Sequence, residues 1–180
     1  MIRCSWVNSN PLYIKYHDDE WGVASYDDNY LFEMLVLESF QAGLSWECIL
    51  NKRENFREAF DNFNYEKISR YSDIKITELL NNKGIVRNKL KIKAIINNSK
   101  VFIDIQKEYG SFSKYIWSFT NNKQIIHNTI VTSNDLSDKI SLDLKKRGMK
   151  FVGTTIIYSY LQAIGVVNDH EKNCFKKKNS

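Results

Sequence analysis

Two Cys/His pairs stand far apart in this 180-residue sequence, and side chains of these types bind metal ions. Cys4 and His17 lie near one end, and His170 and Cys174 near the other. The second pair has i, i+4 spacing, which would place both side chains on one face of a helix. Two thiolates and two imidazoles suit tetrahedral zinc, and four protein ligands leave no open position for water. The set therefore predicts one structural zinc ion that joins the two segments.

Spacing alone leaves an alternative, in which these are two unrelated pairs of a buried cysteine and a surface histidine. The third cysteine, Cys48, follows the core pattern of its neighbours Ile49 and Leu50 and is expected to be buried. Three cysteines spread over the sequence argue against a disulfide-stabilised secreted protein, and residues 1–6 contain no apolar signal core. A cytoplasmic location is expected.

One acidic residue interrupts an otherwise apolar stretch. A single stripe of a helix predicted over 28–42 contains Leu31, Leu35, Glu38 and Ala42. A carboxylate in such a place is costly unless it is paired or lines a cavity. Glu38 therefore lies at an exposed helix end, or forms a salt bridge, or stands at the bottom of a pocket for a cationic or donor-rich ligand.

Aromatic residues surround this acid in the sequence. They are Trp6, Tyr13, Tyr16, Trp21 and Trp46. Each taken singly is more often a core residue than a ligand. Aromatic planes beside a buried carboxylate, however, can stack on a nucleobase and read its edge. The combination favours a pocket for a flipped base.

Two basic turns point to the phosphates of DNA. A hairpin near 79–93 has Gly84 between two predicted helices, where backbone N–H groups and a helix N-terminus can meet a phosphate. Its basic residues are Lys83, Arg87, Lys89, Lys91 and Lys93. A second turn at 145–150 contains Lys146. One such turn would be explained by solubility or the helix dipole, but two in a chain of net charge +5 favour DNA binding.

The elements that must position these residues are predicted to be helices. Seven Gly and one Pro are too few turn formers for a β-sandwich or barrel. Start and stop signals predict a short helix from Asn10–Pro11 toward Trp21, and helices over 28–42, 46–60, 73–82, 88–107, 133–147 and 151–167. The segment 119–132 has no clear period and is expected to be a loop. Without repeats or linkers, residues 1–180 are read as a single all-α domain.

The longest mainly apolar stretch, 151–167, is read as a buried helix. It has 17 residues and contains Thr, Ser and Gln, whereas a membrane span needs about 20 predominantly apolar residues. No membrane association is expected. The basic residues at 176–178 are read as a solvated tail.

Long motifs extend over nearly the whole chain. They read RCSWV at 3–7, PLYIxYHDxEWGV at 11–23, LFEMxxLE at 31–38, QAGLSW at 41–46, KRENF at 52–56, KKRGxKFVGTT at 145–155 and NDH at 168–170. In these motifs the sequence resembles the family of 3-methyladenine DNA glycosylase I. The resemblance implies an all-helical member of the helix-hairpin-helix glycosylases, with its hairpin at 84–87.

The resemblance also implies an activity and a ligand set. The activity is hydrolysis of the N-glycosidic bond of 3-methyladenine in alkylated double-stranded DNA, after base flipping. Cys4, His17, His170 and Cys174 would bind one structural zinc ion. The excised base would contact Glu38 and Tyr16 and stack on Trp46, and Trp6, Tyr13 and Trp21 would form the walls of its pocket.

DNA contacts are expected at the hairpin and at the loop after the helix predicted over 28–42. The residues are Gly43, Leu44, Gly84, Arg87, Lys89 and Lys146. Leu44 is the candidate wedge that enters the duplex gap, and the alternative is an ordinary turn whose leucine is buried. A monomer without a protein partner is expected.

The sequence departs from the superfamily pattern in two places. Val86 stands where the common hairpin has a second glycine, which predicts a phosphate contact that is weaker or differently arranged. No residue matches the catalytic aspartate of the superfamily, so no group is assigned to the attacking water. Three other functions stay open from the sequence alone: a non-catalytic DNA-binding module, a zinc hydrolase with an open coordination position, and an interaction protein that uses the basic tail.

Overall fold

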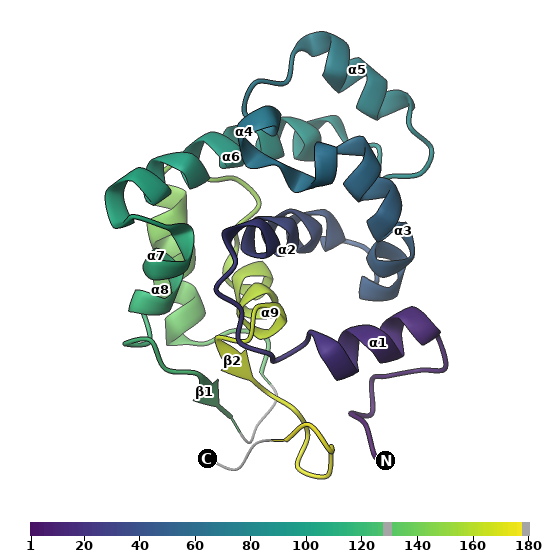
Figure 1. Cartoon of the computed structure of the whole chain (residues 1–180), viewed down its shortest axis with the longest axis vertical. Coiled ribbons are helices and arrows are strands. Elements are labelled where there is room, and N and C mark those ends of the chain that lie inside the picture. The colour runs from purple at the N-terminus through teal and green to yellow at the C-terminus, as the bar shows by residue number, and fades with distance from the viewer. Residues whose placement is uncertain (128–130, 178–180) are drawn as a thin grey trace.

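The computed structural model describes residues 1–127 and 131–177, and nearly all of the regular secondary structure in these ranges is helical (Figure 1). The elements are α1 (Pro11–Asp19), α2 (Asp28–Gln41), α3 (Trp46–Ala59), the 3-10 turn η1 (Asp61–Phe63), α4 (Tyr65–Ile68), α5 (Asp73–Asn81), α6 (Lys89–Tyr109), α7 (Phe112–Ser118), β1 (Ile125–Ile126), α8 (Asp135–Lys146), α9 (Thr154–Ala163) and β2 (Val167–Asn168). The all-α prediction is confirmed, with one small parallel sheet added to it.

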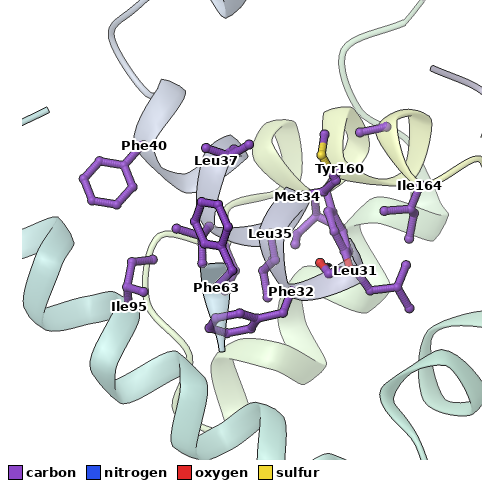
Figure 2. Packing of buried hydrophobic residues seen from close by; sticks show 14 of the residues in the cluster. Leu31, Phe32, Met34, Leu35, Leu37, Phe40, Phe63, Ile95, Tyr160 and Ile164 are labelled. Carbon is purple, nitrogen blue, oxygen red and sulfur yellow. Dashed lines mark hydrogen bonds between the residues drawn. The ribbon is translucent and has the colours of Figure 1, made fainter. Parts of the chain in front are cut away.

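Helix α2 is the centre of the fold. It packs against α3, α6, α7 and α9, and nine of its fourteen residues are buried. Figure 2 shows Leu31, Phe32 and Leu35 of this helix among core side chains from distant parts of the chain. Burying each such side chain stabilises the fold by about 1.5–3 kcal/mol. The helix that contains Glu38 is therefore held from several sides.

Helix starts follow the capping signals of the sequence. At most starts a side-chain oxygen accepts a hydrogen bond from a backbone N–H of the first turn, which satisfies a donor that the helix cannot; α9, which follows Gly153, is an exception. The capping residues of the longer helices include Asn10, Asp27, Ser45, Ser72, Asn88 and Asn134. The start positions predicted at Asn10–Pro11 and Ser45 are confirmed.

The C-terminal apolar stretch departs from the prediction of a helix over 151–167. Phe151 has φ of 55°, in the left-handed region, and a helix cannot start through it. Helix α9 begins only at Thr154, and the chain turns at Gly165, where φ is +73°. A Cβ at Gly165 would lie 2.1 Å from the carbonyl carbon of Val23. Only glycine fits this close approach.

The loop expected over 119–132 is also partly wrong. Residues Ile125–Ile126 form β1 and pair in parallel with Val167–Asn168 of β2. Residues 128–130 of that segment, like Lys178 of the predicted basic tail, lie outside the described residues. The sheet places the residues just after β2 beside α9.

The first and last described segments lie side by side. The backbone N–H of Phe175 donates to the carbonyl of Ile2, and Ser5 donates to the Glu171 carboxylate through both its backbone N–H and its hydroxyl. Helix α5 lies at the end of the molecule opposite to the N-terminus (Figure 1). In the described part of the chain, no helix has the length and apolar character that a membrane crossing requires.

Candidate active site

The four predicted metal ligands meet in one place. The ligand atoms of Cys4, His17, His170 and Cys174 all lie within 4.8 Å of one another, and all four residues are buried. Three of their sulfur–nitrogen separations, from Cys4 to His170 and from Cys174 to both histidines, are 3.4–3.5 Å, close to the about 3.6 Å expected between S and N ligands on one tetrahedral zinc ion. The alternative of two unrelated pairs is wrong. Residues 170–174 form a turn rather than the helix that their spacing indicated.

Hydrogen bonds orient both imidazole rings for metal binding. His17 Nδ1 donates to Asp18 Oδ1 at 2.8 Å, which leaves Nε2 facing the sulfur of Cys174. His170 Nε2 donates to the carbonyl of Trp21 at 3.0 Å, which leaves Nδ1 facing both sulfurs. Ligating histidines are usually held in this way by a carboxylate or carbonyl. The role of Asp18 in orienting His17 was not predicted from the sequence, although its place directly after a candidate metal ligand could have suggested it.

The sulfur atoms are prepared for negative charge by backbone donors. The N–H of Glu171 points to Cys4 Sγ and that of Lys176 to Cys174 Sγ, both at 3.4 Å. Burial raises the pKa of the Cys4 thiol to about 12 and lowers the pKa of His170 to about 4. A bound cation would lower the pKa of the Cys4 thiol and favour its thiolate. The lowered pKa of His170 keeps the imidazole neutral, which is the form that binds a metal. The donor set therefore fits a cation such as zinc.

A cavity of about 260 Å³ lies next to this cluster. All six residues predicted for the base line it, namely Trp6, Tyr13, Tyr16, Trp21, Glu38 and Trp46. The rings of Tyr16 and Trp46 are 5.2 Å apart and tilted, and those of Trp6 and Trp21 are 4.9 Å apart and edge to face. These residues come from the N-terminal segment, from α1 and the turn after it, which contains Trp21, and from α2 and α3. Their residue types indicated that they could form one pocket, although they lie up to 40 positions apart in the sequence.

Glu38 is buried in this cavity without a partner. Its side chain is on the central helix, the residue is 3% exposed, and its Oε2 has no hydrogen-bond partner among the described residues. Burial raises its pKa to about 8. The readings of an exposed helix end and of a salt bridge are thus wrong for the described part of the chain. Burial, and then the charge of Glu38, raise the pKa of Tyr16 as well.

The loop after α2 is exposed, as a wedge requires. Gly43 has φ of +83° and Leu44 is 40% exposed, so the reading of a buried leucine is wrong. The buried Lys91 side chain fixes the start of this loop, because its Nζ donates to the carbonyls of Phe40 and Ala42 at 2.9 and 2.8 Å. Lys91 was expected on the basic rim of the hairpin. It instead connects α6 to the end of α2.

The predicted phosphate contacts lie on the surface, away from the cavity lining. Arg87, Lys89 and Lys146 are exposed. The carbonyl of Gly84 accepts a hydrogen bond from Asn55 at 3.3 Å, which joins the hairpin to α3. Cys48, expected in the core, is half-buried and lines a second, open hollow on α3.

The helices, the hairpin and the aromatic cavity with its buried carboxylate define the class of helix-hairpin-helix DNA glycosylases. The sequence model of a family described as methyladenine glycosylase matches residues 6–177. This chain belongs to that family, which confirms the resemblance found in its motifs.

Relatives of known name are similar over almost their whole length. The chain is 46% identical over 179 residues to DNA-3-methyladenine glycosylase 1 of Escherichia coli (strain K12), covering 97% of this chain and 96% of the relative. It is 41% identical over 177 residues to DNA-3-methyladenine glycosylase of Haemophilus influenzae, with 96% of each covered.

Solved structures agree closely in fold. A crystal structure of 3-methyladenine DNA glycosylase I has a TM-score of 0.95 at 46% identity, covering 98% of this chain and 100% of that one. The enzyme from Staphylococcus aureus, solved as the structural basis of 3-methyladenine recognition, has a TM-score of 0.94 at 37% identity and covers 99% of this chain and 97% of its own.

Proposed function

We propose that this protein hydrolyses the N-glycosidic bond of 3-methyladenine in alkylated double-stranded DNA, releasing the free base and leaving an abasic site. The observation that carries the proposal is the buried, unpartnered carboxylate of Glu38 within an aromatic cavity. The names of the similar proteins support the same reaction.

Methylation of adenine at N3 in DNA gives the base a positive charge and makes it a good leaving group. The enzyme then needs little acid catalysis, and selection of the cationic base supplies most of the effect. Flipping a damaged base out of the duplex has a lower unstacking cost than flipping an intact one. The flipped base enters the cavity and contacts Glu38.

Charge provides the selectivity. Desolvation keeps Glu38 largely protonated in the empty cavity at neutral pH, because its pKa is about 8. A cationic base favours the ionised form, whereas neutral adenine does not. Trp46 stacks on the base, where its ring adds a cation–π contact, and Tyr16 assists at the base edge. Trp6, Tyr13 and Trp21 close the walls.

The DNA contacts follow from the exposed residues. Leu44 on the loop at Gly43 enters the gap left by the flipped base. Gly84, Arg87 and Lys89 of the hairpin, with Lys146 of the second basic turn, contact phosphates. We infer a monomer in the cytoplasm, where the free thiols of Cys4 and Cys174 are kept reduced.

We further propose that Cys4, His17, His170 and Cys174 hold one structural zinc ion. Two thiolates and two oriented imidazoles close its coordination shell, which disfavours a zinc hydrolase with an open position. Its effect on the cavity is indirect. The His170 ring packs edge to face on Trp21 with ring centroids 4.6 Å apart, and His17 packs on Trp6 at 5.2 Å.

The direct test of the function is incubation of the purified protein with DNA that contains 3-methyladenine, followed by chromatography of the released bases. We expect free 3-methyladenine, with unmodified adenine retained in the DNA. Tight binding to the same DNA without base release would instead indicate a non-catalytic binding module.

Replacing Lys89 with Ala tests the phosphate contact at the hairpin. Removal of one lysine–phosphate interaction lowers the slope of log affinity against log salt by about 0.9. We expect that change, with a several-fold loss of affinity at low salt, in titrations against duplex DNA containing an abasic-site analogue. The matched control is Lys107→Ala on the same helix, about 27 Å away at a rise of about 1.5 Å per residue. Equal salt slopes for the two variants would show that Lys89 makes no contact with a DNA phosphate.

A further inference from the structure

Three buried side-chain polar atoms of the described residues have no hydrogen-bond partner, and all three belong to residues that line the same cavity. They are Glu38 Oε2, Trp46 Nε1 and Asp169 Oδ1. Buried polar groups in folded proteins are nearly always paired, so an unpaired one in a cavity marks a place for a ligand atom. The proposed function uses Glu38 and Trp46 for the base. It leaves Asp169 without a role.

The Asp169 carboxylate is rigidly held by one of its two oxygens. Oδ2 accepts hydrogen bonds from the Tyr158 hydroxyl at 2.6 Å and from Gln162 Nε2 at 2.8 Å. Both donors are on α9, and the side chain of Asp169 is fully buried. The pairing of β2 with β1 fixes the chain just before it. Oδ1 has no hydrogen-bond partner, and Asp169 is one of the residues that line the cavity.

His127 approaches the same carboxylate from another segment. Its Nδ1 lies 3.2 Å from Asp169 Oδ1, without hydrogen-bond geometry, and 3.2 Å from the Tyr158 hydroxyl. The His127 side chain is 28% exposed, whereas Asp169 is not exposed at all. A buried acid with a purely structural role would have both oxygens satisfied. In Asp169, Oδ2 accepts two hydrogen bonds from α9, whereas Oδ1 lies near His127 but accepts no hydrogen bond.

We propose that Asp169 binds and orients the water that attacks the sugar carbon of the lesion; this inference rests on the proposed function. Glu38 is occupied by the base edge, so the acceptor that remains in the cavity is Oδ1 of the second carboxylate, which has no hydrogen-bond partner. In the reaction, the bond from C1′ to the base nitrogen breaks and its electron pair leaves with the base, which becomes neutral. The water oxygen bonds to C1′, and the proton it loses leaves along the hydrogen bond to Asp169 Oδ1.

The decisive variant is Asp169→Asn, which keeps the size of the side chain and removes its charge. We expect the single-turnover rate of 3-methyladenine release to fall roughly 100-fold, a typical effect of losing a group that handles a proton in the transition state. Affinity for free 3-methyladenine, followed by tryptophan fluorescence, should stay within about two-fold of the parent, since Glu38 and Trp46 remain. Glu38→Gln is the matched comparison, because it should weaken binding of the free base as well.

Metal content and melting temperature are measured on the same samples, because Asp169 precedes His170. Two further variants, Tyr158→Phe and Gln162→Met, loosen the carboxylate without removing it, and each should lower the release rate by about 10-fold with base affinity retained. They decide the question if Asp169→Asn does not fold.

Two results would overturn this inference but not the proposed function. In the first, the parent releases base and Asp169→Asn releases it at a rate within three-fold of the parent. In the second, Asp169→Asn loses base affinity in parallel with its release rate. A parent that releases no base would overturn the proposed function with it.

Discussion

Glu38→Gln is expected to lower the single-turnover release of 3-methyladenine by about 100-fold or more. The substitution keeps the shape of the side chain and removes its ability to become a carboxylate. In a desolvated cavity, the attraction between a carboxylate and a cationic base is stronger than it would be in water. Loss of one group that stabilises charge in this way typically lowers the rate by about 10²–10³. Discrimination between methylated and unmodified adenine should fall with it.

The same substitution is expected to make the protein more stable. The pKa of Glu38 is about 8 in the folded protein and 4.5 for an ordinary glutamate. Between these values the unfolded chain releases a proton that the folded chain retains, so the stability contributed by this group falls as pH rises from 4.5 to 8. At pH 7 the penalty is about 3 kcal/mol, from about 1.36 kcal/mol for each pH unit.

Urea unfolding of Glu38→Gln and of the parent at pH 5 and pH 7.5 checks this expectation. The variant should gain stability at pH 7.5 and little at pH 5. Glu58→Gln, at an exposed position of α3, is the control and should change neither rate nor stability. A stability difference independent of pH would show that Glu38 does not titrate as a buried acid.

Loss of the metal is expected to have the second largest effect. The proposed zinc ion on Cys4 and Cys174 would close a loop of nearly the whole chain, and closing so long a loop stabilises a fold by about 4–5 kcal/mol in the chain-entropy model. For a protein of this size, each kcal/mol shifts the melting temperature by about 2–4 °C. Chelation or Cys174→Ala should therefore lower the melting temperature by about 10 °C or more.

Metal analysis and thermal unfolding on the same samples separate the outcomes. Cys48→Ala is the control, since Cys48 is half-buried on α3 and outside the cluster. It should keep both zinc and melting temperature. If chelation stopped base release at a temperature where the fold is intact, the metal would be catalytic rather than structural.

Local signals allowed much of the site to be predicted. The caps at Asn10 and Ser45 act within one helical turn, and the period of α2 placed Glu38 on an apolar stripe. The four candidate metal ligands were visible from their residue types, but only the fold shows that they meet. These predictions needed no knowledge of which segments meet.

What depended on distant contacts could not be predicted. Lys91 looked like a surface lysine until α6 was placed against the end of α2. A two-residue strand such as β1 has no period of its own and exists only through β2. Asp169 was visible in the NDH motif, but its free oxygen follows from a cavity and from two partners on α9.

The union of the first and last segments also affects how the protein is made. Trp6 and Trp21 rest on histidines whose sulfur partner, Cys174, leaves the ribosome 170 residues after Cys4. A nascent chain can therefore form its inner helices early, but it cannot hold the aromatic walls in place until this last cysteine has emerged. A translation product that ends before Cys174 would therefore lack one of the contacts that hold these histidines, and with them the aromatic walls, in place.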